Sequence, residues 1–585
     1  MRVKSAIAVF VLGLLALFVG IGQRTFWAPP ETVSVTVPAS VQDAPLTVVA
    51  PSFAGFGGKA VTVDVKGEGT FTVATGRPDD VDAWVGKTAH NTVQGLNADK
   101  TALDVQHSDG DATSPNPAEA DLWATTQAGN GDLSFKWNAP ASGDWSLLIA
   151  SDGSKPAPKQ IEFTFANQAT SPWSIPLIVL GGLLMLGALL FIFLFGKGGT
   201  GGKTAVAGPS TGAPESSHEA SDGEASDDGG KPSAFLRRPA TAGVTALVLG
   251  VSALGGLAGV APAHADSTPS PSSSDSASAS DSAPATGDAQ SGVPVLTAPQ
   301  LARILNRTAD AITSADAARN AKDLGSRASG DALTIRTQNY KIQAAVKDAA
   351  AVAPVSSDNV LAHAVTNDRS WPRTVLAVTQ GAKNPTPVIL TLQQASAREN
   401  YKLVTSAYLL PTQTFPVMGK DSAPTQAESD ANGLTVSPDD AFKSLTARLK
   451  DAKSADGAKF ADGSFFQETE SFKTDLLAAK DNKAGLVPQF DVQLIGQPKV
   501  TFKAADGSAL SVADLKFTVV IPQKNSGDIV TLDPRIAALT GEQKSEKKVT
   551  QTFIVSAVVR IPRAGSADKL TLIGADRYLT AASLG

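Results

Sequence analysis

The sequence predicts a multi-domain membrane protein with three transmembrane helices, an N-terminal all-β sandwich and a C-terminal α+β portion. Three uncharged apolar segments are about long enough to cross a bilayer. Residues 31–170 contain short β-rich runs separated by turn residues, and residues 297–585 place helical patterns before strand patterns. The chain has 585 residues, enough for several domains of roughly 150 residues each.

Composition excludes several classes of protein. The chain contains no cysteine, which excludes disulfides, thiolate metal sites and cysteine nucleophiles. Its net charge of -6 argues against a general nucleic-acid binder, so no nucleic-acid partner is expected. Charged residues make up 18%, below the roughly 25% of typical globular proteins. This deficit indicates long stretches that are either membrane-embedded or uncharged and flexible.

The first two apolar segments are predicted to be membrane anchors. Residues 5–22 follow Arg2 and Lys4, and no small-x-small cleavage triplet comes after them, which indicates an uncleaved signal anchor. Residues 173–196 form the most apolar segment, which is followed directly by Lys197. Two tryptophans flank these segments where an aromatic belt at one membrane face would lie, namely Trp27 and Trp173.

The third apolar segment, 240–262, allows two interpretations. Arg237 and Arg238 precede it, and the small residues Ala263 and Ala265 follow it, which is the pattern of a secretory signal sequence placed inside the chain. The segment is therefore either a third anchor or an internal signal that is cleaved after Ala265. Cleavage would release a secreted C-terminal protein.

Basic residues orient all three segments in the same way. The N-terminal residues 1–4 and the loop 197–238 carry the positive charges that mark the cytoplasmic side. Residues 24–172 and everything after residue 263 are then outside the cell. We therefore expect a multi-pass protein of the cell membrane, in contact with the lipid bilayer, with most of its folded mass extracytoplasmic.

The outer segment 31–170 has the strand spacing of an antiparallel sandwich. Its β-rich runs are 32–37, 60–65, 70–74, 133–137, 145–149 and 161–165. The run 142–153 resembles the penultimate strand of small jelly-roll-like modules of secreted bacterial proteins. Trp137 and Trp145 sit in strand patterns and are expected in the core. Trp84 and Trp123 sit near loops and are candidates for contact with a glycan or a protein partner.

Three acidic or glycine-rich motifs resemble ligand sites without matching them. Asp79, Asp80 and Asp82, and separately Asp109 and Asp111, are clustered carboxylates of the kind that bind calcium. Neither spacing matches a calcium loop, so we expect both clusters to be solvated acidic turns. Residues 196–204 resemble a phosphate-binding loop, yet Lys197 stands where that motif needs glycine. We therefore expect no metal site, no cofactor site and no bound cofactor.

Two segments are too polar to fold. The expected cytoplasmic loop 197–238 is rich in Ser, Gly and Asp. Residues 266–292 contain ten serines and no Leu, Ile, Val or aromatic residue. We expect 266–296 to be a disordered stalk that separates the C-terminal part from the membrane.

The C-terminal half carries an apparent internal duplication with an offset of 140 residues. Thr297 and Gln300 form a capping-box pattern before a helix, and Ser437 opens a similar helix. Residues 314–319 and 454–459 also share their pattern. Strand patterns follow in both copies, so 297–412 and 437–585 are predicted to be α+β units joined by a linker at 413–436.

The element order of these units is similar to that of nuclear-transport-factor-two-like folds, in which a curved sheet wraps helices around a pocket. The resemblance implies that an acid–base pair is present in some relatives. No spacing singles out such a pair here, so no catalytic residue is assigned. The candidates are His363, Asp368, Tyr340 and Tyr401 in the first unit and Asp491 and Tyr578 in the second. Asp576 and Arg577, directly before Tyr578, are expected to form an ion pair at the edge of a turn.

The two outer parts carry opposite net charge. Residues 24–172 have 9 basic and 17 acidic side chains, a net of -8, whereas residues 297–585 have 34 basic and 29 acidic side chains, a net of +5. The cationic part is therefore predicted to dock on the acidic part, on anionic lipid or on a wall polymer. The densest basic spot is Lys544, Lys547 and Lys548.

Three motifs carry a resemblance to a family: the Thr-Ala-Pro-Gln-Leu opening at 297–301, Ser-Trp-Pro-Arg-Thr at 370–374 and Asn-Tyr-Lys-Leu-Val at 400–404. They resemble a C-terminal domain of unknown function in membrane-anchored envelope proteins of actinobacteria, some of which have a glycosyltransferase label. We expect a membrane-anchored scaffold or binding protein of the cell envelope, whose partner is a wall glycan or another envelope protein. The alternative is an envelope enzyme that acts on a wall or lipid-linked substrate.

Overall fold

The computed structural model describes residues 2–53, 61–97, 102–138, 144–167, 172–195, 295–367, 369–382, 384–418, 431, 433–478, 486–523, 527 and 529–585. The predicted loop 197–238, the third apolar segment 240–262 with Ala263 and Ala265, and nearly all of the predicted stalk 266–296 lie outside these residues. Most of the predicted linker 413–436 also lies outside them.

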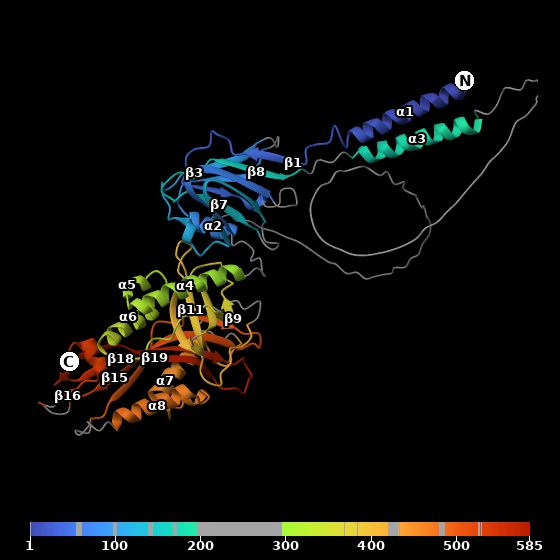
Figure 1. Ribbon diagram of the computed structural model, residues 1–585. Helices are drawn as coiled ribbons and strands as arrows, with labels where there is room; N and C mark the ends of the chain where they lie inside the picture. The colour runs from blue at the N-terminus through green and yellow to red at the C-terminus, as the bar shows by residue number, and fades with distance from the viewer. Residues whose placement is uncertain are drawn as a thin grey trace, which may run out of the picture. The chain divides into compact units, whose positions relative to one another are not determined.

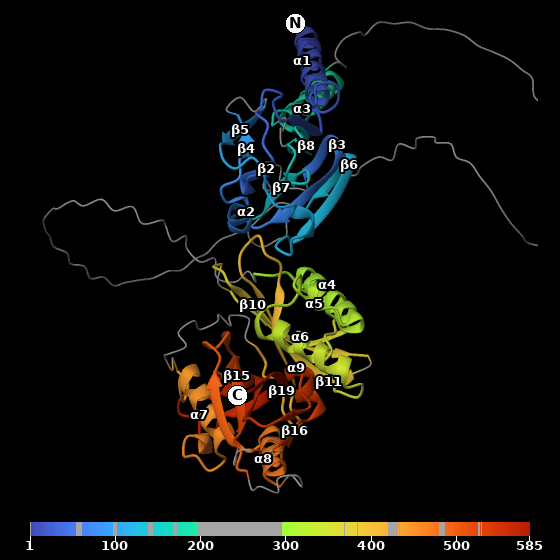
Figure 2. The ribbon, with the colours of Figure 1, turned by 90° about the vertical axis from the view of Figure 1, so that its left-hand side faces the viewer.

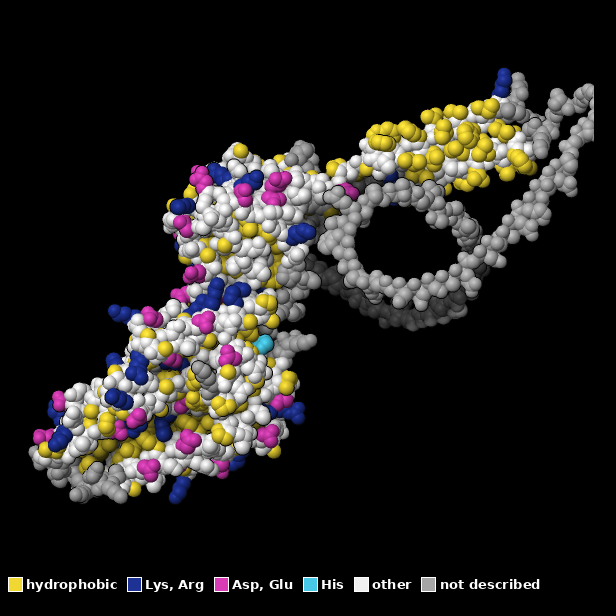
Figure 3. Space-filling view, in the orientation of Figure 1, with side chains coloured by type: hydrophobic (Ala, Val, Ile, Leu, Met, Phe, Trp, Pro, Cys, Tyr) yellow, Lys and Arg dark blue, Asp and Glu magenta, His cyan; other side chains and the backbone are white. Residues whose placement is uncertain are grey.

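Two helices are long and apolar enough to cross a membrane, which confirms the first two predicted segments as apolar helices. They are α1 (Arg2–Gly22) and α3 (Ser174–Phe195) (Figure 1). Hydrophobic side chains cover both of them (Figure 3). A β-carbon at Gly20 would lie 2.8 Å from Cγ1 of Ile178, so the helices approach closely there. The described residues thus contain two such helices, where the sequence predicted three.

The segment between these helices forms one sheet, not the predicted sandwich of two. Its strands are β1 (Thr32–Thr36), β2 (Leu46–Val49), β3 (Val61–Gly76), β4 (His90–Leu96), β5 (Leu103–Ser108), β6 (Thr125–Trp137), β7 (Ser146–Ala150) and β8 (Gln160–Ala166). They run in the order β1-β8-β3-β7-β2-β4-β5, with β6 against β3. All the pairs are antiparallel except β2 with β4. The sheet curls into a nearly closed barrel around an apolar core (Figure 2).

The sandwich prediction failed because two predicted strands are one. Residues 61–65 of the first run and 70–74 of the second both belong to β3, which continues through a register shift between Lys66 and Thr70. The first half of β3 pairs with β8 and the second half with β7. One long strand therefore joins what would have been two layers into a single sheet.

A close approach of backbone and ring at Gly129 gives a testable result. Gly129 on β6 lies opposite Phe71 on β3, and a β-carbon there would lie 2.3 Å from Cζ of the Phe71 ring. We expect Gly129→Ala to lower the free energy of unfolding of the barrel by about 1–3 kcal/mol through overpacking. Thermal unfolding measures this. The control is Gly95→Ala, where nothing lies within 4 Å, and an equal loss in both variants would contradict the expectation.

The first C-terminal unit places helices before an antiparallel sheet, as predicted. Its helices are α4 (Ala298–Ala318), α5 (Ala321–Leu324) and α6 (Gly330–Ala345), followed by β9 (Asn359–Val365), β10 (Arg373–Gly381), β11 (Asn384–Gln394) and β12 (Lys402–Tyr408). The strands pair in the order β12-β11-β10-β9. The capping box of Thr297 and Gln300 is present at the start of α4.

The second unit repeats this order with additions. Its helices α7 (Pro438–Lys450) and α8 (Ser464–Leu477) precede β13 (Gln489–Leu494), β14 (Val500–Lys503), β15 (Ala509–Ile521), β16 (Val530–Thr531), α9 (Pro534–Thr540), β17 (Lys544–Ser545), β18 (Val549–Ile561) and β19 (Thr571–Leu584). The main sheet runs β13-β15-β18-β19, with β14 against β15. The shared segments 314–319 and 454–459 differ in structure, because α4 reaches Ala318 while α7 ends at Lys450.

The two units stack as four layers: helices, sheet, sheet and helices. Alternate residues of β10 explain this arrangement, since Val375 faces α4 and α6 while Leu376 faces the second sheet. On the second sheet, Val512 faces the first sheet, whereas Ala513 faces α7 and α8. Each sheet is thus covered on both faces, one by helices and the other by its neighbouring sheet (Figure 1).

Candidate functional site

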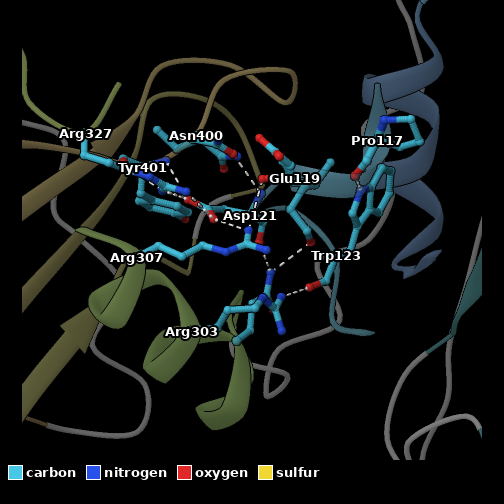
Figure 4. A network of polar contacts seen from close by, with 12 residues as sticks. Pro117, Glu119, Asp121, Trp123, Arg303, Arg307, Arg327, Asn400 and Tyr401 are labelled. Atoms are coloured by element: carbon cyan, nitrogen blue, oxygen red, sulfur yellow. Dashed lines mark hydrogen bonds and ion pairs between the residues drawn. The ribbon is translucent and has the colours of Figure 1, made fainter. Parts of the chain in front are cut away.

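The barrel and the C-terminal part meet at a buried carboxylate, that of Asp121, whose side chain is 0% exposed. Asp121 follows a short 3-10 turn, Pro117–Glu119, and precedes β6. Arg327 binds both of its carboxylate oxygens, and Arg307 lies 3.2 Å from Oδ1 (Figure 4). The backbone N–H of Tyr401 donates to Oδ2 at 3.1 Å. Two arginines and one amide from three different segments therefore converge on one barrel carboxylate.

Side chains of helix α4 donate hydrogen bonds to backbone carbonyl groups of the same barrel loop, residues 119–123. Gln300 donates to the carbonyl oxygens of Asp121 at 2.9 Å and Leu122 at 2.8 Å. Arg303 donates to the Trp123 carbonyl, and Arg307 also donates to the Glu119 carbonyl at 3.0 Å. The spacing 300, 303 and 307 places these side chains on one helix face. Burial, and then the nearby Arg307, lower the pKa of the Arg303 guanidinium.

A second contact area lies at helix α2 (Pro78–Val85) of the barrel. Arg398, in the turn between β11 and β12, donates to the carbonyl oxygens of Trp84 at 2.6 Å and Val85 at 2.7 Å. Carbonyls at a helix C-terminus attract cations, so this arginine caps α2. Arg373 on β10 forms an ion pair with Asp80 at 2.6 Å, and both side chains are almost fully buried.

The two tryptophans proposed for glycan or partner contact lie under this interface. Trp84 is 1% exposed and Trp123 is 0% exposed, and their ring centroids are 5.5 Å apart. They belong to an apolar cluster that includes Ala397 of the C-terminal part. Neither indole offers a face to a sugar ring, because burial leaves no open surface.

The acidic clusters have different surroundings. Asp79 and Asp80 were expected to be solvated turn residues, but they pair with Arg369 and Arg373. Burial, and then the neighbouring Asp79, raise the pKa of the Asp82 carboxyl. Asp109 and Asp111 are exposed. Across the described ranges, no group of three or more His, Asp or Glu side chains is arranged to hold a metal ion.

A pocket of about 610 Å³ lies beside β19, the edge strand of the second sheet. The end of β12 and the start of α8 complete its walls. Burial raises the pKa values of the carboxyl of Asp576 and the hydroxyl of Tyr408, and it lowers the pKa of the Arg577 guanidinium. The hydroxyl of Tyr578 donates to Asp576. The pocket thus gathers ionisable groups with perturbed pKa values, which is a frequent property of binding sites.

The other acid–base candidates are not brought together. His363 is exposed on β9, and Asp368 lies outside the described residues. The Tyr340 hydroxyl donates to Asp316 at 2.5 Å, Tyr401 is buried, and Asp491 pairs with Lys450 at 3.0 Å. Among the described candidates, only Tyr578 is linked to the pocket, because its hydroxyl donates to Asp576. Asp576 and Arg577, which were expected to form an ion pair with each other, both line the pocket.

A family model described as "Domain of unknown function (DUF8094)" matches residues 292–584, half of the 585-residue chain. The chain belongs to the DUF8094 family. Searches of curated proteins and of solved structures gave no match. The matched range contains both α+β units, so the DUF8094 domain corresponds to the four stacked layers.

The DUF8094 domain also carries the predicted basic spot. Lys544, Lys547 and Lys548 are all exposed on and after β17. They are far in sequence from the arginines of the interface, which the sequence reasoning missed. One available signal was the spacing of Gln300, Arg303 and Arg307 on a helix face that carries few other charges.

Proposed function

We propose that this protein is a membrane-anchored extracytoplasmic scaffold or binding protein of the bacterial cell envelope, in which the acidic barrel and the cationic DUF8094 domain dock on each other. The observation that carries the proposal is the buried Asp121 carboxylate with Arg327, Arg307 and the Tyr401 amide around it. A buried ion pair with several hydrogen bonds specifies one geometry. Such docking would present both domains to a partner as one unit.

Membrane attachment is supported by the ends of the two apolar helices. Helix α1 ends at Gly22 and α3 begins at Ser174, so the barrel strands lie in sequence between the C-terminal end of α1 and the N-terminal end of α3. Trp27 and Trp173 at these ends are 59% and 68% exposed, as membrane-interface tryptophans would be in a membrane-free structure. Arg2 and Lys4 lie in the first turn of α1, and Lys197 follows α3 in sequence, so these basic residues belong to the opposite ends. This pattern supports a barrel outside the cytoplasm.

The partner in this proposal is a wall glycan or another envelope protein. The exposed lysines Lys544, Lys547 and Lys548 offer a contact to anionic lipid or anionic wall polymer. No nucleic-acid partner is proposed.

Protease treatment of intact cells tests the orientation. We expect added protease to release fragments from 31–170 and 295–585, because both stretches are proposed to face outward. Mass spectrometry of the released peptides identifies them, with a cytoplasmic protein as the control for lysis. Release of peptides only after cell lysis would contradict the proposal. A fragment that begins at Asp266 before protease is added would instead establish cleavage after Ala265.

A further inference from the structure

We propose that the pocket beside β19 binds the carboxylate of a small organic acid with an apolar body, and that Arg577 is the residue that binds this carboxylate. The inference goes beyond the proposed function and does not depend on which side of a membrane the domain faces. It rests on an arginine that lines a pocket and has no carboxylate within ion-pair distance in the part of the chain that the structure describes.

Arg577 is held among aromatic rings. The carbon of its guanidinium lies 4.2 Å from the centroid of the Phe472 ring, 5.7 Å from that of Phe517 and 5.9 Å from that of Phe553. One guanidinium nitrogen donates to the Thr469 hydroxyl at 3.4 Å. Stacking on aromatic rings fixes the plane of a guanidinium but leaves its hydrogen-bond donors available.

No carboxylate pairs with Arg577 among the residues that the structure describes. The neighbouring carboxylate of Asp576 is occupied, because it accepts from the Tyr578 hydroxyl and from the backbone N–H of Arg577 at 2.9 Å. A partly buried cation without an ion pair is costly, and an incoming anion removes that cost. The guanidinium therefore supplies the polar half of a binding site.

The rest of the pocket supplies an apolar half. Most of its wall is formed by proline, leucine and aromatic side chains, namely Pro385, Pro387, Tyr408, Leu409, Leu410, Pro411 and Phe465. Gln413 adds an amide. Between two wall residues lies Thr412, a β-branched residue with φ of 65°, in the left-handed region that such residues rarely adopt. The volume of about 610 Å³ is in the range of small-molecule sites.

Nearby negative charge selects the type of anion. Glu468 on α8 and Asp576 both line the pocket, and both act electrostatically on Arg577. A phosphate group carries about -1.5 to -2 charges near pH 7, so these carboxylates repel it roughly twice as strongly as a carboxylate with one charge. The pocket therefore favours a carboxylate over a phosphate.

Calorimetric titration of the full chain in detergent tests the inference. The probes are hippurate, which joins a carboxylate to a benzamide, its neutral amide hippuramide, and inorganic phosphate. We expect hippurate to bind and to lose at least about tenfold in affinity in Arg577→Met, because a charge-assisted hydrogen bond is lost. Glu468→Gln is expected to tighten hippurate binding by about two- to threefold by removing a repelling charge. Lys548→Gln, an exposed cation away from the pocket, is the matched control and should change nothing.

The variant at Glu468 keeps the test decisive even where Arg577→Met fails to fold, because Glu468 is exposed on α8. Absence of hippurate binding, equal binding of hippuramide, tighter binding of phosphate, or weaker hippurate binding by Glu468→Gln would each overturn the inference. A change of affinity in Lys548→Gln equal to that in Arg577→Met would overturn it as well, since binding would then follow net charge.

Discussion

Replacing Asp121 by asparagine is expected to release the barrel from the DUF8094 domain. The substitution keeps the shape of the side chain but removes the charge that Arg327 and Arg307 face. Removing one partner of a buried pair typically costs about 3–5 kcal/mol, because the remaining charge stays buried without compensation. Hydrogen exchange of the full chain should then rise at 117–124 and along the start of α4, while the β15–β18 pair stays protected.

The matched control for this experiment is Asp144→Asn, because Asp144 is an exposed barrel carboxylate. It removes the same charge from the barrel and should leave exchange unchanged. Equal protection of α4 in the wild type and in Asp121→Asn would show that the carboxylate does not hold the two domains together. A similar loss in both variants would point to the overall charge of the barrel instead.

The second large effect is a pH dependence that originates at Asp514, which lies fully buried between the two sheets of the DUF8094 domain. Burial raises the pKa of Asp514 to about 6, although Lys499 at 3.0 Å opposes the shift. Four groups face this carboxylate: Lys499, Asp331 on α6, Thr405 on β12 and Ser556 on β18. The pKa of Lys499 is raised, so Lys499 stays charged across the relevant pH range.

The direction of the effect follows from proton linkage. Since the pKa of Asp514 is higher in the folded protein than in the unfolded chain, its contribution to stability is complete below about pH 4 and is lost as the pH rises through about 6. The slope for one group is at most about 1.4 kcal/mol per pH unit.

Chemical unfolding of the DUF8094 domain within the full chain, measured between pH 4 and 7, tests this. We expect Asp514→Asn to remove the decline with pH that the wild type shows. Asp475→Asn, at an exposed carboxylate on α8, should retain the decline. Identical pH profiles for the wild type and Asp514→Asn would contradict the assignment.

Local sequence signals predicted the elements better than their assembly. The apolar runs at 5–22 and 173–196 and the capping box at Thr297 each act within a few residues, so the sequence alone is enough to recognise them. The joining of 61–65 and 70–74 into β3 depends on pairing with β7 and β8, whose paired residues lie 70 to 102 positions further along the chain. Such pairing leaves no local signal, which explains why one sheet was read as two.

The candidate site shows the same limit. Opposite net charges of residues 24–172 and 297–585 were visible from composition, and they led to the expectation of docking. The atoms that carry the contact include the Trp84 and Trp123 carbonyl groups, which every residue type possesses. The two indoles are buried in a cluster of mostly barrel residues that also includes Ala397, and their burial could not be inferred from strand spacing. The sequence predicted an ion pair for Arg577. In the structure its guanidinium instead lies against aromatic rings from α8, β15 and β18, which sequence spacing does not bring together.

The shared faces of the two sheets limit how this domain can be divided. Four apolar side chains of the first sheet and six of the second pack against one another, and Leu409, Phe415 and Met418 pack against the same cluster. Either half expressed alone would expose the apolar face of its sheet to water and would tend strongly to aggregate. The two units of the apparent duplication can therefore diverge in sequence but cannot be separated. A useful truncation has to keep both units.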